Sequence, residues 1–170
     1  MAFLSKETID KAPVMTGAAP ELDTAALPEH PGELFASWFE LAVEQQVGDA
    51  RAMHLATVDK AGFPDARVVN LMAVDDNGFS FGTGAGSMKS EQLEENQVAA
   101  LSFYWQPLLR AVRVRGEAHL APMPEGASGG FQIWSVQPSH IEFWQGGGGH
   151  DATRIQYDKT GEQWGAQVLG

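Results

Sequence analysis

Residues 53–84 read MHLATVDKAGFPDARVVNLMAVDDNGFSFGTG, and they alternate strand-like segments with turn-like segments. The strand-like segments, residues 53–59, 66–75 and 79–84, are rich in β-branched and other apolar residues. Between them lie KAGFPD and DNG, which carry the glycine, proline and asparagine typical of tight turns. This pattern predicts consecutive antiparallel strands joined by short turns.

The same pattern continues toward the C-terminus. Further strands are predicted at residues 98–105, 110–122, 139–146, 153–158 and 163–169, with a loop at 123–130. Two segments have helical character instead: PGELFASWFELAVEQQVGD, where Leu34, Phe35 and Trp38 share one face, and SMKSEQLEENQ, which Ser87 is placed to cap. We therefore predict a mainly β fold of the α+β class, an antiparallel barrel with a leading helix and a short internal helix.

Length and composition limit the class of protein. Residues 1–30 are rich in proline, glycine and acids and predict an extended or disordered arm, whereas residues 31–170 suit one domain. The chain has no cysteine, and its formal net charge of -11 argues against nucleic-acid binding. It contains no apolar run long enough for a membrane span, and MAFLSKETIDK lacks the apolar core of a signal peptide. We expect a cytoplasmic protein.

Metal-binding and nucleophile motifs are missing from the sequence. The five histidines show no metal-ligand spacing, and neither GxSxG nor a P-loop occurs. His140 and Glu142 lie two apart on a predicted strand and so share a face, which fits a surface pair better than half of a metal site. No side chain stands out as a catalytic acid, base or nucleophile.

A glycine-rich turn, GTGAGS, leads into the predicted internal helix. Thr83, Ser87 and Lys89 surround this helix start, and backbone amides, hydroxyls and a lysine together suit a phosphate group. Arg67, on the neighbouring strand, supplies a second cation. Trp144 and Arg154, far along the chain, add a flat wall and another cation. By itself the turn is better explained as a capped helix, but together these groups suit a ligand with an aromatic ring and a phosphate.

The chain resembles the pyridoxamine 5'-phosphate oxidase family of FMN-binding split β-barrels, from Pro31 to Tyr157. The resemblance is carried by LATVDKAGFPDARVVNL, FSFGTGAGSMKSEQLEENQVAALSFYW, VRVRGEAHL and IEFWQGG, in this order. It implies a homodimer with FMN at the subunit interface, Trp144 and Arg154 completing the pocket from the partner subunit. The implied cofactor-binding residues are Arg67, Val68, Val69, Asn70, Leu71, Met72, Gly82, Thr83, Ser87, Met88, Lys89, Trp144 and Arg154.

Several departures from the family pattern fall on the substrate side. Met72 stands where the family's oxidases typically carry a lysine, and His150 and Ala152 stand where they carry an arginine and a histidine. Met88 replaces a common cation, Ala111 a common glutamine, and the segment after Leu120 is several tens of residues shorter than in the family. Met72 and His150 are the candidate substrate contacts.

The resemblance and its departures together favour an FMN-dependent oxidoreductase acting on an unidentified small substrate. Two alternatives stay open: a genuine pyridoxine/pyridoxamine 5'-phosphate oxidase with a reduced substrate site, and a non-catalytic flavin-binding protein. A deazaflavin in place of FMN is a further possibility, since related split barrels bind either.

Overall fold

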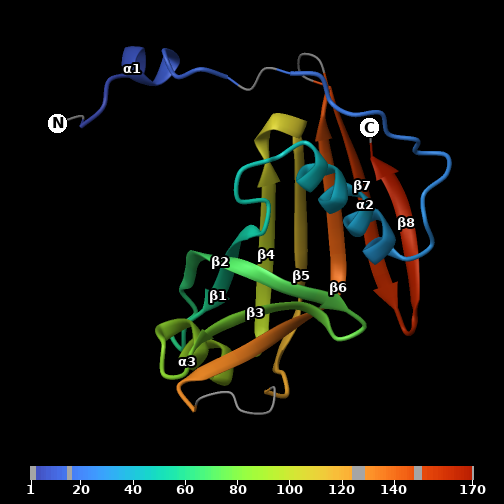
Figure 1. Cartoon of the computed structure of the whole chain (residues 1–170). Coiled ribbons are helices and arrows are strands. Elements are labelled where there is room, and N and C mark those ends of the chain that lie inside the picture. Colours follow the sequence, from blue (N-terminus) through green and yellow to red (C-terminus); the bar gives the residue numbers. More distant parts are fainter. Residues whose placement is uncertain (1–2, 15–16, 124–128, 148–150, 170) are drawn as a thin grey trace.

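The computed structural model of the chain describes residues 3–14, 17–123, 129–147 and 151–169. Eight strands and three α-helices make up this part (Figure 1). In chain order they are α1 (Lys6–Asp10), α2 (Pro31–Glu44), β1 (Ala52–Val58), β2 (Pro64–Asp75), β3 (Gly78–Gly84), α3 (Met88–Glu95), β4 (Val98–Trp105), the 3₁₀ turn η1 (Gln106–Leu108), β5 (Arg110–Leu120), β6 (Phe131–Gly146), β7 (Ala152–Thr160) and β8 (Gln163–Leu169).

All strand pairings are antiparallel, and six of the strands close into a barrel. The strand order is β3-β2-β1-β4-β5-β6-β7-β8, and an additional pairing of β3 with β6 closes the ring. The long strand β6 pairs with β5 along one edge. Along its other edge it pairs first with β3 and then with β7, so that β7 and β8 extend the sheet beyond the barrel. The predicted antiparallel barrel with a leading and an internal helix is confirmed.

The helix α2 covers the barrel with its aromatic face. Phe35 packs edge-on against Phe79 of β3 at a ring distance of 4.8 Å and against Phe103 of β4 at 5.1 Å. Trp38 packs against Phe143 of β6 at 5.2 Å. The helix begins at Pro31, as its sequence predicts, because the His30 ring accepts the free N–H of Gly32 at 3.1 Å. It ends at Glu44, earlier than the predicted helical segment.

The strand β6 starts earlier than the sequence predicts. It begins at Phe131, whereas the prediction placed the strand at residues 139–146. Pro138 lies inside the strand, opposite Gly116, at the point where the register between β5 and β6 shifts. A proline inside a strand-like run normally indicates a strand end, but a bulge accommodates it here. Residues 131–136 are the ones that pair with β3 and close the barrel.

The second half of the predicted arm, residues 17–30, lies against the barrel. Gln145 donates to the carbonyl of Pro20 at 2.9 Å, and the hydroxyl of Tyr157 donates to the carbonyl of Pro28 at 2.9 Å. Arg110 stacks over the Trp38 ring at 4.1 Å, and burial lowers the pKa of Arg110 to about 10. Farther out, Ser5 caps the short helix α1, which the sequence analysis did not predict.

Candidate cofactor site

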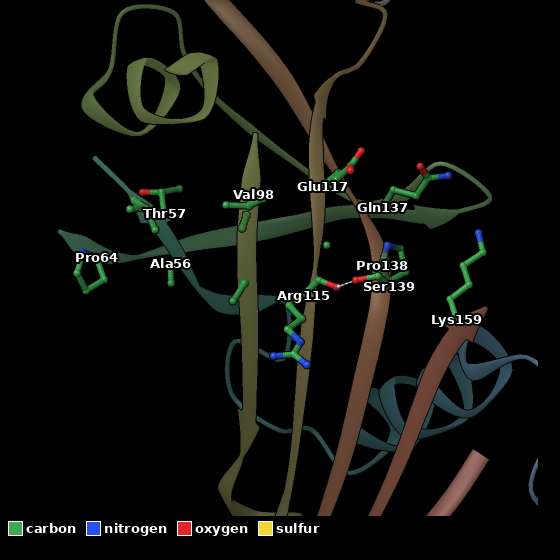
Figure 2. A pocket seen from close by; sticks show the side chains of 14 residues that line it. Ala56, Thr57, Pro64, Val98, Arg115, Glu117, Gln137, Pro138, Ser139 and Lys159 are labelled. Carbon is green, nitrogen blue, oxygen red and sulfur yellow. Dashed lines mark hydrogen bonds between the residues drawn. The ribbon is translucent and has the colours of Figure 1, made fainter. Parts of the chain in front are cut away.

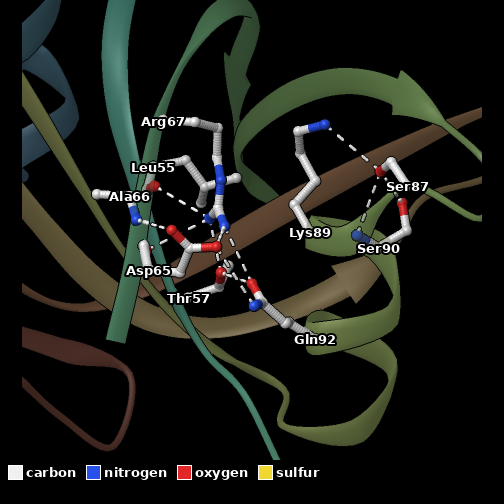
Figure 3. A network of polar contacts seen from close by, with 9 residues as sticks. All are labelled: Leu55, Thr57, Asp65, Ala66, Arg67, Ser87, Lys89, Ser90 and Gln92. Atoms are coloured by element: carbon white, nitrogen blue, oxygen red, sulfur yellow. Dashed lines mark hydrogen bonds and ion pairs between the residues drawn. The ribbon is translucent and has the colours of Figure 1, made fainter. Parts of the chain in front are cut away.

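Three hydroxyls and a lysine gather at the N-terminus of α3, as the sequence predicts. The Ser87 hydroxyl lies 3.0 Å from that of Thr83 and 3.2 Å from that of Ser90, and it accepts the Ser90 N–H at 3.4 Å (Figure 3). The Lys89 ammonium donates to the same hydroxyl at 3.4 Å. Within the described part of the chain, no carboxylate forms an ion pair with Lys89. The half-buried ammonium therefore has spare charge and spare donors for an anion.

Arg67 reaches the same helix but is already well bonded. Its guanidinium donates to Thr57 at 2.6 Å and to Gln92 at 3.0 Å, and it forms an ion pair with Asp65 at 2.8 Å (Figure 3). Gln92 lies three residues after Lys89, so both side chains belong to one face of α3. The structure thus brings Arg67 to the helix face that carries Lys89, with Asp65 balancing its charge.

Thr57, Asp65 and Gln92 are members of this network that the sequence analysis missed. Their only signal in the sequence is the alternation along β1 and β2, which turns Thr57, Asp65 and Arg67 to the same side of the sheet. The partner on α3, Gln92, is separated from Arg67 by a further strand and a turn, so no local pattern reveals it.

The strand after Arg67 presents an exposed, largely apolar edge, and it pairs with β3, which leads into the phosphate cradle. Val68 is 59 % exposed and Met72 is 54 % exposed, whereas Leu71 is buried and Val69 packs partly against the core. Asn70 is exposed between them. From Arg67 to Met72, every second residue of β2 thus faces outward and can contact a flat ring, while the residues between them face the barrel. Met88, at the start of α3, is also exposed.

Trp144 and Arg154 lie next to each other, but far from the cradle at the N-terminus of α3. They are directly paired across β6 and β7, and Ala111 of β5 pairs with Trp144 from the other side. Figure 1 shows the C-terminal end of β6 at the opposite end of the barrel from α3. One chain therefore does not bring this pair to the cradle. Ala152 begins β7, whereas His150 lies outside the described residues.

The outer face of the sheet carries alternating charges. Arg113 contacts Glu142 at 2.6 Å, and Gln156 donates to the same carboxylate at 2.8 Å. Burial alone raises the pKa of Glu142, but hydrogen bonds from Gln156 and Arg113 and the nearby positive charges outweigh it, so the net pKa is lowered. His140 pairs with Asp158 at 2.7 Å. His140 and Glu142 thus share one face of β6, as predicted, and each bonds to a residue of a neighbouring strand.

A groove of about 630 Å³ crosses this outer face at the bulge (Figure 2). Pro138 and Ser139 line it from β6, Arg115 from β5 and Lys159 from β7. The Ser139 hydroxyl donates to the carbonyl of Arg115 at 3.4 Å, which holds the bulge together. Its lining mixes apolar side chains with both signs of charge.

Among the residues that the structure describes, no three histidine or acidic side chains gather closely enough to hold a metal ion. No helix in these residues combines the length and apolar character that crossing a bilayer requires.

Solved structures with this fold place it in a known class. The structure of PhzG from Burkholderia lata 383 in complex with tetrahydrophenazine-1-carboxylic acid superposes with a TM-score of 0.83 at 20% identity, covering 90% of this chain and 99% of that one. A pyridoxamine 5'-phosphate oxidase-related, FMN binding protein from Nostoc punctiforme PCC 73102 has a TM-score of 0.68 at 16% identity, covering 86% and 98%. The fold is that of the FMN-binding split β-barrels.

Sequence comparison narrows this class to one family. Residues 39–145 match the family described as pyridoxamine 5'-phosphate oxidase. The pyridoxine/pyridoxamine 5'-phosphate oxidase of Rhodopseudomonas palustris is 32% identical over 80% of this chain and 87% of its own. That of Shewanella frigidimarina is 33% identical over 87% and 92%. The chain belongs to the pyridoxamine 5'-phosphate oxidase family.

Proposed function

We propose that the protein is an FMN-dependent oxidoreductase that acts on a small substrate as a homodimer. The observation that carries this proposal is the pairing of the Lys89 cradle with the exposed edge of β2. The cradle offers two hydroxyls at a helix start and a cation that has no ion-pair partner among the described residues, and the edge offers a largely apolar surface on the adjacent strand. A phosphate joined to a flat ring matches both parts.

The donor set fits the phosphate of FMN. A phosphate dianion needs a positive charge and several hydrogen-bond donors, which Lys89, Thr83, Ser87 and the first amides of α3 can supply. Arg67 adds a longer-range positive charge that Asp65 partly offsets. When bound, FMN supplies the hydride chemistry, while the chain supplies position, exclusion of water and charge.

The homodimer follows from the separation of the two halves of the proposed site. Trp144 and Arg154 are adjacent but lie at the far end of the barrel from α3, so they would serve the site of a second copy. The groove on the outer face supports contact with such a copy, because its lining carries both signs of charge and opposite charges on one surface can pair across a two-fold axis. Sedimentation should then show a dimer. A monomer that binds one FMN would contradict this part.

The first test is the absorption spectrum of the purified protein, followed by mass analysis of whatever heat releases. We expect an oxidised flavin spectrum and release of FMN. Release of a deazaflavin would mean that the cofactor is a deazaflavin rather than FMN. A colourless protein that does not bind added FMN would refute the proposed function.

A second candidate function is genuine pyridoxine/pyridoxamine 5'-phosphate oxidation. The relatives with that name, which are 32% and 33% identical over most of their length, favour it. Against it stand the apolar Met72 and the short connection between β5 and β6, residues 121–130. Oxygen uptake with pyridoxamine phosphate on FMN-loaded protein separates the two candidates. A non-catalytic flavin protein would instead keep its flavin oxidised with NAD(P)H and with every substrate tested.

A further inference from the structure

Phe131 and Met72 converge above Gly82, on the exposed side of the sheet. A methyl group on Gly82 would overlap the Phe131 ring, lying 2.8 Å from Cε2, and would lie 3.0 Å from the Met72 sulfur. Glycine at this position therefore lets both side chains reach one spot. The ring and the thioether therefore lie on the same side of the sheet, over the same glycine.

This aromatic–thioether pair is partly open to solvent. Phe131 is 39 % exposed and Met72 is 54 % exposed. Phe131 is the first residue of β6, directly after the short connection from β5, so the connection brings an aromatic ring to the site. Gly82 precedes Thr83 of the cradle, and Met72 ends the exposed edge of β2. Because Met72 is itself one of the proposed flavin contacts, the pair forms an apolar wall at that end of the proposed flavin position.

On the side of Met72 that faces α2, the electrostatics are unfavourable for an anion. Met72 also lines a cleft of about 570 Å³ between α2 and the second half of β2. Four carboxylates line this cleft against a single arginine: Glu33, Glu40, Asp75 and Asp76 with Arg51. A phosphate group brought to Met72 would meet an apolar wall and a surplus of negative charge, and both raise its free energy relative to water.

We propose that Phe131 and Met72 form the wall against which the substrate binds, and that this wall selects an uncharged, apolar ring over a phosphate ester. The proposal deepens the proposed function and rests on it, because the wall is placed beside the flavin through Val68–Met72. It assigns to Phe131 a role in specificity, through contact with the ring of the substrate.

The test compares two ligands that share a ring and differ only in the phosphate. FMN-loaded protein is titrated with 2-naphthol, which is uncharged at neutral pH, and with 2-naphthyl phosphate, and the perturbation of the flavin absorption band reports binding. We expect 2-naphthol to bind at least about tenfold more tightly than its phosphate ester. Equal affinities, or tighter binding of the ester, would overturn the proposal.

Variants then assign the effect to the wall. We expect Phe131→Ala to weaken 2-naphthol binding about tenfold, because the aromatic contact and its buried area are lost, and Phe131→Leu to restore part of it. The matched control is Phe63→Ala, which removes a ring that is 70 % exposed in the turn between β1 and β2. Unchanged 2-naphthol binding by Phe131→Ala would refute the role of Phe131.

FMN affinity, measured in parallel, separates this inference from the proposed function. The Phe131 variants should keep wild-type FMN affinity, which also shows that they fold. If the wild type binds FMN but not 2-naphthol, the wall is refuted and the flavin site stands. If the wild type does not bind FMN, the proposed function fails, and this inference fails with it.

Discussion

The substitution Lys89→Ala tests the phosphate cradle with little disturbance of the fold. In the structure, Lys89 makes one hydrogen bond, to Ser87 at 3.4 Å, and has no carboxylate partner among the described residues. Alanine is favourable inside a helix, so the free energy of unfolding should change by no more than about 0.5 kcal/mol. A bound phosphate, in contrast, loses a charge-assisted hydrogen bond of about 1.5–3 kcal/mol.

This loss corresponds to a weakening of FMN binding by about ten- to a hundredfold. Riboflavin has the same ring but no phosphate, so its affinity should stay within about twofold of the wild type. Quenching of flavin fluorescence during titration measures both affinities. Lys60→Ala is the matched control, since Lys60 is highly exposed and its ammonium lies 3.9 Å from Glu95, at the other end of α3.

Three results would refute the reasoning. If Lys89→Ala weakened FMN and riboflavin equally, Lys89 would contact the ring or support the fold, and the cradle would not be a phosphate site. If neither affinity changed, the phosphate would be held elsewhere. A similar loss in Lys60→Ala would mean that the net charge of the protein, rather than a local contact, controls binding.

Four further outcomes are expected. Arg67→Ala should lower the free energy of unfolding in urea by about 1–3 kcal/mol, because buried hydrogen-bonding groups at the end of the barrel lose their partner; wild-type stability would show that the network is dispensable. Gly78→Ala should lower Tm strongly, since Gly78 has a φ of 106° and a methyl group there would overlap the carbonyl of Val136; an unchanged Tm would contradict this steric argument. Glu142 has a lowered pKa in the fold, so its contribution to stability is present above the ordinary pKa of 4.5 and is lost as pH falls through the folded value. The difference in unfolding free energy between wild type and Glu142→Gln should therefore shrink in acid. A difference that stays constant with pH would argue against the charged contacts. Pyridoxamine phosphate should be oxidised much more slowly than about 1 s⁻¹, and Met72→Lys should recover little of this activity; rapid turnover by the wild type would favour the second candidate function.

Periodicity and turn residues were sufficient to predict the barrel. The run from Met53 to Gly84 contains three strands and two turns whose signals are local, and the helix α2 has an apolar face together with a proline at its start. The first half of β6 could not be predicted in this way, because Pro138 breaks the pattern and its compensating bulge depends on Gly116 of another strand. Local sequence signals thus predict helices and strands, but not a bulge that depends on a residue of the partner strand.

In the candidate site, too, local features could be predicted from the sequence and contacts between distant segments could not. Thr83, Ser87 and Lys89 belong to one short segment, so their proximity was predictable from spacing. The bonding of Arg67 to Asp65 and Gln92 was not, and it changes the expected role of Arg67 from a free cation to one already balanced. The roles of the cofactor residues as FMN contacts stay predictions.

The pairing of β3 with β6 has a consequence for the order of folding during synthesis. Residues 79–84 acquire their second neighbour only when residues 131–136 have left the ribosome, so until then β3 is an open edge that can pair with other chains. The segment around Pro20 and Pro28 is made first but docks last, because its partners Gln145 and Tyr157 come near the C-terminus. Such non-local closure makes folding slow. Chaperone dependence in the cell should therefore be greatest for nascent chains that end between β3 and β6.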